Sequence, residues 1–260
     1  MNTRNATPVQ VLVTREHDVA TVMLSNPAKR NALTESMWKT IASTFRALAR
    51  EPLRAVLVCG DGGHFAAGAD IGEFPKIRMS RIDAMRYHMQ TVAHALSAIE
   101  ECPHVTVAAI EGSCVGGGLE IALACDLRIA RQGAVFGIPA GRLGFPLAPT
   151  ELRLLLDTVN RTVAAELLLE CRTYDSRRAV ETGLITRECT DLQAEVLATI
   201  ERLRTGSIDA AREHKQWLRR LGADRSGRGP QLQSEELLRS MDFAERPEYR
   251  NRVNGFLERG

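Results

Sequence analysis

Apolar positions follow two different periods along the first half of this chain. Four short runs of β-branched and aliphatic residues predict buried strands, at 9–13, 19–24, 55–59 and 105–110. A polar turn at 16–18 separates the first two runs and predicts a hairpin. Apolar residues spaced by three and four predict amphipathic helices over about 33–50, capped by Thr34, and over about 81–101. The pattern therefore predicts a sheet with helices packed against it.

The second half of the chain changes from alternating elements to continuous helix. Further elements are expected in this order: strands at 126–130 and 135–137, a loop at 139–146, helices at about 148–157, 161–170 and 176–182, a short strand at Leu184–Ile185, and a helix near 191–204. The part from 206 to 260 is polar and helical, with a flexible connection at 226–230. This order indicates an α/β core over 1–205 and a helical region over 206–260.

The apolar positions of the 81–101 helix are expected on one buried face: Met85, Met89, Val92, Leu96 and Ile99. The loop at 60–71, which follows the third strand, is too rich in glycine and alanine to serve only as a solvent-facing connection.

Composition is that of an ordinary globular protein. Of 260 residues, 44% are hydrophobic and 25% are charged, which suits one large domain or a domain with an appendage. The net charge of +2 gives no reason to expect nucleic acid as the main partner. No run approaches the ~18 apolar residues that span a bilayer, and residues 1–10 lack the apolar stretch of a secretory signal. Six scattered cysteines without Cys-x-x-Cys pairs indicate reduced core residues of a cytoplasmic protein, rather than disulfides or metal ligands.

The end of the chain is locally basic. Between 201 and 230 there are 8 Lys or Arg residues against 4 Asp or Glu residues. A solvated helical face explains this charge, and a contact for an anionic ligand is the alternative. RNA binding would rest on this segment alone, and the balanced overall charge argues against it.

A glycine-rich turn joins the strand at 105–110 to a helix-forming stretch that contains Glu120. Three adjacent glycines occupy 116–118, and helix propensity rises across 119–124. A strand, glycine turn and helix leave unpaired N–H groups at the helix start, where a phosphate or an oxygen that becomes negative during a reaction can bind. Apolar neighbours would raise the pKa of Glu120 toward the range useful for proton transfer.

A purely structural interpretation explains the same turn. The glycines would let the strand and the helix pack closely, while Glu120 complements the helix dipole and faces water. The turn is not a dinucleotide fingerprint, because the Gly-x-Gly-x-x-Gly spacing is missing, and not a P-loop, because no Lys-Ser or Lys-Thr follows the glycines.

Five stretches together resemble the crotonase (enoyl-CoA hydratase/isomerase) superfamily. They resemble its two coenzyme A loops, its central helix and two shorter signatures, at 26–33, 65–71, 116–126, 136–139 and 183–185. The resemblance covers about 10–200 well and the helical end loosely. It implies an α/β fold with a ββα spiral core and a C-terminal α-helical trimerisation region, assembled as a homotrimer or a dimer of trimers.

The resemblance also implies an acyl-CoA substrate and no separate cofactor, because coenzyme A is part of the substrate. The thioester oxygen would lie between the N–H groups of Ala69 and Gly117, where each donor to an enolate is worth ~3 kcal/mol. Glycine would be needed at 117 because a Cβ would crowd the ligand. Glu120 would act as acid and base. The other implied substrate-binding residues are Lys29, Arg30, Ala66, Gly68, Asp70, Ile71, Gly116 and Ala140.

One position departs from the family pattern. Family hydratases pair the glutamate of the central helix with a second glutamate, and the second falls here on Ala140. An efficient hydratase is therefore not expected, because hydration needs a water oriented by two carboxylates. One carboxylate beside an oxyanion hole can still move a proton during double-bond migration. Glu73, Asp70 and Glu151 are candidate substitutes, each interpreted first as a surface or structural residue.

Several other side chains keep two interpretations. Lys29 and Arg30 would line the nucleotide part of the ligand or would be ordinary exposed charges. His64 and Arg142 are expected to hold loops, Arg142 through hydrogen bonds to carbonyl groups. Apolar side chains that would line the acyl pocket or pack in the core are Met85, Phe145 and Leu147.

The predicted activity is that of an enoyl-CoA isomerase or a divergent hydratase. The alternatives are decarboxylation, thioester hydrolysis and a non-catalytic acyl-CoA-binding or scaffold protein.

Overall fold

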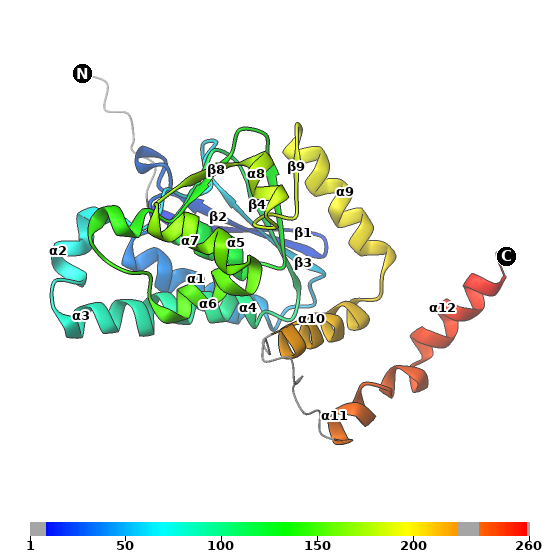
Figure 1. Cartoon of the computed structure of the whole chain (residues 1–260). Helices are drawn as coiled ribbons and strands as arrows, with labels where there is room; N and C mark the ends of the chain where they lie inside the picture. The colour runs from blue at the N-terminus through cyan, green and yellow to red at the C-terminus, as the bar shows by residue number, and fades with distance from the viewer. Residues whose placement is uncertain (1–8, 223–233, 259–260) are drawn as a thin grey trace. The chain divides into compact units, whose positions relative to one another are not determined.

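The computed structural model describes residues 9–222 and 234–258, so the connection expected at 226–230 lies outside the described residues. The chain divides into two compact units, 1–205 and 206–260 (Figure 1). All strands found in the described ranges belong to the first unit. The assignment of the first unit to acyl-CoA binding and of the second to oligomerisation stays a prediction.

The main sheet of the first unit has six strands in the order β1-β2-β3-β4-β6-β9. Their bounds are Gln10–Glu16, Val19–Ser25, Ala55–Gly60, Val105–Ile110, Leu127–Arg131 and Arg187–Cys189. β1 pairs with β2 in an antiparallel hairpin, and every other neighbouring pair is parallel. The hairpin and the four strands predicted from the apolar runs are confirmed. Parallel neighbours need crossover connections, which the intervening helices supply.

A second, smaller sheet contains β5 (Ser113–Val115), β7 (Val135–Gly137) and β8 (Thr173–Asp175). The hydrophobic pattern does not predict β5 or β8, because three-residue strands carry too little periodicity. The predicted strand at Leu184–Ile185 is wrong. Both residues are buried in a bend, and the strand β9 begins at Arg187, where it pairs with β6. Residues 184 and 185 are apolar because they are buried, and not because they form a strand.

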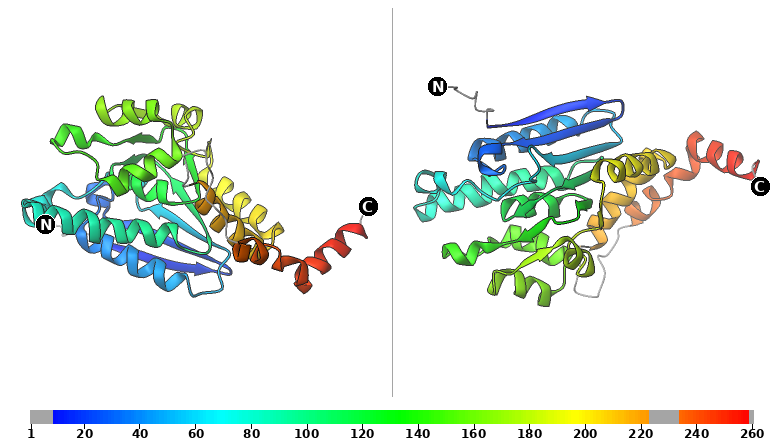
Figure 2. Two further views of the ribbon diagram at one scale, coloured as in Figure 1. Left: turned by 60° about the horizontal axis from the view of Figure 1, so that its bottom comes forward. Right: turned by 90° about the horizontal axis from the view of Figure 1, so that it is seen from above.

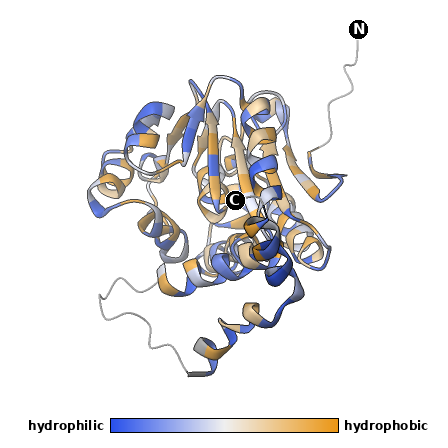
Figure 3. Cartoon of the chain, turned by 90° about the vertical axis from the view of Figure 1, so that its right-hand side faces the viewer, coloured by the Kyte–Doolittle hydropathy of each residue, from blue (hydrophilic) through white to orange (hydrophobic). Residues whose placement is uncertain are grey.

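Two long helical segments pack side by side against the sheet (Figure 2). The helix α1 (Glu35–Leu48) begins at Thr34, whose hydroxyl accepts a hydrogen bond from Met37 N at 3.2 Å, so the predicted cap is confirmed. Its partner α4 spans Ala93–Glu100. Apolar residues run along the strands and alternate with polar residues around the helices (Figure 3). The helix α5 (Gly117–Ala124) is the exception, because all of its residues are buried.

The predicted helix over 81–101 forms, but its buried face differs from the predicted one. A π-helical segment at Tyr87–Val92 joins α3 (Arg81–Arg86) to α4. A π-turn adds one residue to the helical repeat and so rotates the preceding residues about the axis. Met85 and Met89 are consequently 59% and 48% exposed, and Tyr87 is buried instead.

The remaining helices lie within a few residues of their predicted bounds where the pattern predicted them. In the first unit they are α2 (Phe74–Ile77), α6 (Pro149–Thr158), α7 (Arg161–Leu169), α8 (Ser176–Glu181) and α9 (Leu192–Thr205). In the second unit they are α10 (Ile208–Gly222), α11 (Ser234–Arg239) and α12 (Pro247–Leu257). No helix in the described ranges has both the length and the apolar character needed to cross a membrane. All six cysteines carry free thiols.

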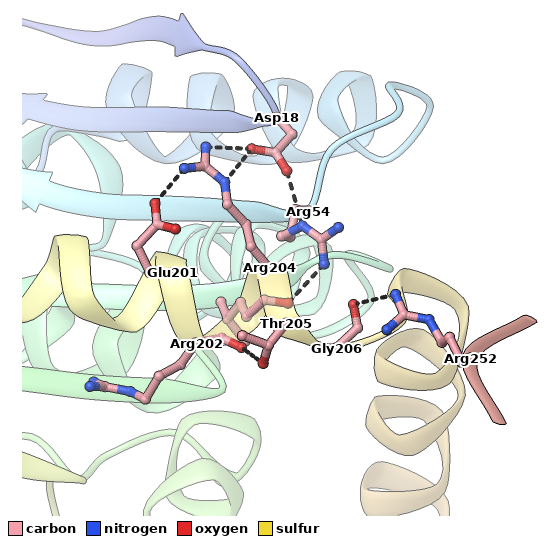
Figure 4. A network of polar contacts seen from close by, with 9 residues as sticks. Asp18, Arg54, Glu201, Arg202, Arg204, Thr205, Gly206 and Arg252 are labelled. Atoms are coloured by element: carbon pink, nitrogen blue, oxygen red, sulfur yellow. Dashed lines mark hydrogen bonds and ion pairs between the residues drawn. The ribbon is translucent and has the colours of Figure 1, made fainter. Parts of the chain in front are cut away.

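A polar network fixes the β1–β2 turn to the end of α9 (Figure 4). Asp18 accepts hydrogen bonds from Arg204 Nη2 at 2.8 Å and from Arg54 Nε at 3.0 Å. Arg54 also donates to the carbonyl of Leu203 at 2.8 Å. These bonds, with that of Arg204 the strongest influence, lower the pKa of Asp18. Arg204 belongs to the basic stretch, and its two carboxylate partners favour a solvated, ion-paired face for that stretch.

Candidate active site

One pocket in the first unit gathers residues from six stretches of the chain. Its walls come from α1, the loop after β3, the α2–α3 region with the π-helical segment, the start of α5, the turn after β7, and α6. Seven of the predicted site residues line it: Gly68, Ala69, Ile71, Gly116, Gly117, Glu120 and Ala140. The tertiary fold therefore brings the second loop, the glycine turn and the central helix to a single cavity.

The backbone around Ala69 is arranged so that its N–H group points away from α1. Leu33 N donates to Gly68 O at 2.7 Å, and Asp70 N donates to Leu33 O at 2.8 Å. Because main-chain groups alternate sides along an extended segment, the N–H of Ala69 faces the opposite way from these two bonds. Across 9–222 and 234–258, no acceptor is found for that N–H.

The start of α5 supplies a second free donor. Gly116 adopts φ +51°, a conformation that suits glycine, and its N–H donates to Gly137 O at 2.8 Å. Gly117 is the first residue of α5, and no hydrogen-bond acceptor for its N–H is found within the described residues. A Cβ built on Gly68 would lie 3.8 Å from Gly117 N, so the two segments are in close contact. The two N–H groups are thus available in one pocket, and their role as an oxyanion hole stays a prediction.

Packing within the protein already requires glycine at 117, and the prediction that a Cβ there would crowd the ligand stays a prediction. A Cβ at this position would lie 2.8 Å from Cζ2 of Trp38 and 3.3 Å from Cδ1 of Leu33, both of which are core side chains. At Gly118, a Cβ would lie 2.5 Å from the carbonyl oxygen of Ala66. Close packing against α1 and the 65–71 loop therefore requires these glycines, whatever ligand binds.

Glu120 lies within the pocket and is only 6% exposed. Burial raises its pKa well above the ordinary value, the charge of Glu151 raises it further, and the charge of Arg78 opposes the shift. The alternative interpretation, in which Glu120 faces water, is therefore wrong. A raised pKa makes a carboxyl group hold its proton more readily than an ordinary one, which suits a group that must both give and take a proton.

Glu151 is more closely tied to the pocket than the sequence suggested. It lies at the third position of α6, is 2% exposed and lines the same cavity as Glu120. Its Oε1 is 2.7 Å from Nδ1 of His88, and its Oε2 accepts a hydrogen bond from Ala148 N at 3.1 Å. The interpretation as a surface residue is wrong. Pro149 at the helix start and a glutamate two residues later are the sequence signal that could have located it.

The other two candidate substitutes have structural partners. Glu73 accepts a hydrogen bond from Glu35 N at 2.7 Å and so caps α1. Asp70 accepts from Gly72 N and forms an ion pair of 2.6 Å with Lys29. Neither lines the pocket.

Four predicted ligand contacts lie outside the pocket lining: Lys29, Arg30, Ala66 and Asp70. Ala66 is fully buried, and its N–H and carbonyl bond to Ser113 and Val115. Lys29 and Arg30 are exposed, in keeping with either interpretation of their charges. Arg142 donates to Cys171 O at 2.9 Å, which confirms its loop-holding role. His64 Nδ1 accepts a hydrogen bond from Ser113 N at 3.1 Å, also within a loop.

The rest of the pocket wall contains apolar side chains that the sequence predicted and one arginine that it did not. Phe145 and Leu147 line it as expected, whereas Met85 does not, because the π-turn directs it to solvent. Arg78 lies over two phenyl rings that meet edge to face, with its Cζ 3.9 Å from the ring centroid of Phe145 and 4.4 Å from that of Phe74. Phe74 and Arg78 are four residues apart at the end of α2, whereas no sequence spacing predicts the contact with Phe145.

The enoyl-CoA hydratase/isomerase family model matches residues 14–260. The chain belongs to this family. The Δ(3,5)-Δ(2,4)-dienoyl-CoA isomerase of mouse mitochondria is 31% identical over 200 residues, 73% of this chain and 61% of that protein. A probable enoyl-CoA hydratase of Mycobacterium bovis is 32% identical over 213 residues, 81% of each chain. This chain thus spans less than two thirds of the mouse isomerase.

A solved structure confirms the fold. The crystal structure of an enoyl-CoA hydratase/carnitine racemase from Magnetospirillum magneticum has a TM-score of 0.91 and 33% identity. The match covers 97% of this chain and 94% of that chain. The α/β crotonase fold with two sheets and C-terminal helices, expected from the motifs, is therefore confirmed.

Proposed function

We propose that this family member is an acyl-CoA thioester enzyme of the hydratase/isomerase type, which stabilises a thioester enolate. The observation that carries the proposal is the arrangement around Glu120. A buried carboxyl group with a raised pKa shares one pocket with Ala69 and Gly117, whose N–H groups have no acceptor among the described residues. Named relatives that isomerise or hydrate enoyl-CoA substrates support the substrate class.

The two N–H groups act on the thioester oxygen. As a proton leaves C2, or as water adds to C3, negative charge moves onto that oxygen, and fixed donors at both amides stabilise it. Losing one such donor from a comparable site costs about 10²–10³ in rate. Glu120 takes or gives the C2 proton, and the upward direction of its pKa shift favours this role.

Decarboxylation and thioester hydrolysis are the alternatives within the family fold, because the two N–H groups alone would support either. Thioester hydrolysis differs from the proposal in one measurable respect, since it forms no C2 enolate and so does not exchange the C2 proton of an unreactive acyl-CoA. A non-catalytic binding protein would not exchange it either.

Deuterium exchange at C2 of butyryl-CoA in D₂O, followed by mass spectrometry, tests the proposal directly. The full chain should exchange the C2 protons, and the variant Glu120→Gln should not. Crotonyl-CoA and a 3-enoyl-CoA, assayed in parallel, separate hydration from double-bond migration. Tight binding of acyl-CoA without exchange or turnover would leave only a binding role.

We also propose that the second unit mediates assembly into a homotrimer or a dimer of trimers. A chain that ends at residue 205 should then dissociate and become poorly soluble. Light scattering of the full and shortened chains measures this, and a monodisperse trimer of the shortened chain would contradict it.

The exposed Lys29 and Arg30 are proposed to meet the anionic nucleotide part of coenzyme A, and a cytoplasmic location is proposed from the free thiols.

A further inference from the structure

Two carboxyl groups enter the same pocket from two helices that pack together. Glu120 lies in the first turn of α5, and Glu151 lies in the first turn of α6. Both line the cavity, and both are nearly inaccessible, at 6% and 2% exposed. Ala140, where the family pattern has its second glutamate, lines the same cavity and offers only a methyl group. The pocket therefore contains a second carboxyl group, but a different segment supplies it.

Both oxygens of Glu151 are held in place. His88 Nδ1 contacts Oε1 at 2.7 Å, and the N–H of Ala148 donates to Oε2 at 3.1 Å. The His88 side chain is 15% exposed and also lines the pocket. It lies edge-on to the ring of Tyr87, with centroids 5.1 Å apart. An acid/base group must be held in a fixed orientation to act on a bound substrate, and these contacts hold Glu151 in that way.

The π-helical segment changes which residues flank His88 on the pocket side. His88 lies four residues before Val92, so even a continuous α-helix would place the two on one face. The extra residue of the π-turn exposes Met89 and buries Tyr87, and Tyr87, His88 and Val92 line the cavity. Single π-turns occur frequently at functional sites, because they redirect side chains in this manner.

We propose that Glu151 is the second proton-transfer group of this pocket, with His88 as its positioning residue, and that the reaction is hydration of a 2-enoyl-CoA. This proposal rests on the proposed function. The water oxygen bonds to C3 as the C2=C3 π bond breaks, and one water proton passes to the Glu151 carboxylate. The protonated Glu120 gives its proton to C2. The thioester oxygen carries the negative charge between these steps. One proton then returns from Glu151 to Glu120 through solvent, so the enzyme is restored.

The charged and titratable groups that share the pocket with Glu151 come from three elements. Glu120 projects from α5, while Tyr87 and His88 belong to the π-helical segment, and Arg78 follows α2. The pH dependence of the hydration rate therefore reflects the coupled titration of Glu151 and these four groups, and not that of Glu151 alone. For this reason the test depends on differences between matched variants.

The structural alternative is that Glu151 only caps α6 by accepting the N–H of Ala148. The variant Glu151→Gln keeps an oxygen that can accept this bond but cannot take a proton. Asn160→Ala is a matched control, because Asn160 caps the neighbouring helix α7 through a 3.0 Å bond from Val163 N and does not line the pocket. It should lower the melting temperature without changing hydration.

Hydration of crotonyl-CoA and C2 exchange in butyryl-CoA, both measured on the full chain, separate the outcomes. Glu151→Gln should lower kcat for hydration by about 10²–10⁴ with KM within about threefold, whereas C2 exchange stays within about threefold of the unmodified chain. His88→Ala should lower hydration and shift its pH profile, and His88→Asn, which keeps a donor near Oε1, should recover part of the loss.

Three results would overturn the inference. Hydration by Glu151→Gln within threefold of the unmodified chain would leave Glu151 as a cap only. An unmodified chain that exchanges C2 protons but does not hydrate crotonyl-CoA would refute hydration while sparing the enolate chemistry. Failure of C2 exchange in the unmodified chain would instead refute the proposed function, and the role of Glu151 with it.

Discussion

The two sides of the pocket are built in different ways. One side, formed by the 68–71 loop and the start of α5, presents main-chain N–H groups fixed by glycine packing and by bonds to Leu33 and Gly137. The other side presents side chains, among them Arg78, His88 and Glu151, which come from the end of α2, the π-helical segment and the start of α6. A pattern of glycines marks the first side in the sequence, whereas no glycine pattern marks the second side.

This difference has a functional meaning. A main-chain donor can be placed only by the backbone, so it requires particular glycines at particular positions. A carboxyl group can be supplied from any segment that reaches the cavity. The family pattern is therefore kept at 116–120, while Ala140 replaces the second glutamate and Glu151 enters from α6.

The largest effect is expected for Glu120→Gln, which removes the proton-transfer group of the main-chain side. Hydration and C2 exchange should both fall by about 10²–10⁴, because both pass through the same C2 proton. If hydration fell but C2 exchange did not, Glu120 would not be the group that moves the C2 proton. Its role would then be no different from that of Glu151. Steady-state kinetics and mass spectrometry measure the two losses.

The same variant should be more stable than the unmodified chain at alkaline pH. Burial raises the pKa of Glu120 above its ordinary 4.5, so the folded chain keeps a proton that the unfolded chain releases. The stability that this proton contributes is present below pH 4.5 and is lost as pH rises through the folded-state pKa. Urea unfolding at several pH values should show the difference growing with pH, and a constant difference would contradict the burial argument.

Gly117→Ala tests the packing of the main-chain side. The added Cβ would meet Trp38 Cζ2 at 2.8 Å, so unfolding free energy should fall by about 1–3 kcal/mol. Turnover should fall more than acyl-CoA binding, because donor geometry matters most in the transition state. Trp38→Phe in the same chain should recover part of the stability. If it recovers none, the clash with Trp38 is not the cause.

Arg78→Met tests the side-chain wall with a smaller expected effect. Methionine keeps contact with Phe74 and Phe145 but removes the charge that opposes the raised pKa of Glu120. The limb of the pH–rate profile that belongs to Glu120 should move to higher pH. An unchanged profile, measured by hydration rate against pH, would show that Arg78 only closes the pocket.

Asp18→Asn should have the smallest effect and serves as a distant control. The Arg204 hydrogen bond lowers the pKa of Asp18, so its contribution to stability is present above the ordinary pKa and is lost as pH falls. Because the Asp18 and Arg204 side chains are 30% and 34% exposed, solvent screens the pair, and the loss should stay below about 1 kcal/mol at pH 7. Activity should not change, and a change would mean that the hairpin turn is coupled to the pocket.

The sequence by itself determined five of the six strands of the main sheet, the capped helix α1, the central helix and the family. These features follow from the hydrophobic periodicity, from the cap residue Thr34 and from the glycines at 116–118. All three are local signals that can be recognised in a short stretch of sequence. Unpaired N–H groups at the start of the central helix were expected from the glycine turn, and the pair at Ala69 and Gly117 from the resemblance to the family, although the packing reason for glycine at 117 was not.

Only the tertiary structure decided which side chains complete the pocket. The π-turn at Tyr87–Val92 exposes Met85 and Met89 and buries Tyr87, and the helical repeat in the sequence does not predict it. Glu151 resembles an ordinary capping glutamate until α6 packs against α5 and buries it beside Glu120. Burial and proximity between distant segments set the orientation and proton affinity of a carboxyl group, and neither is a property of local sequence.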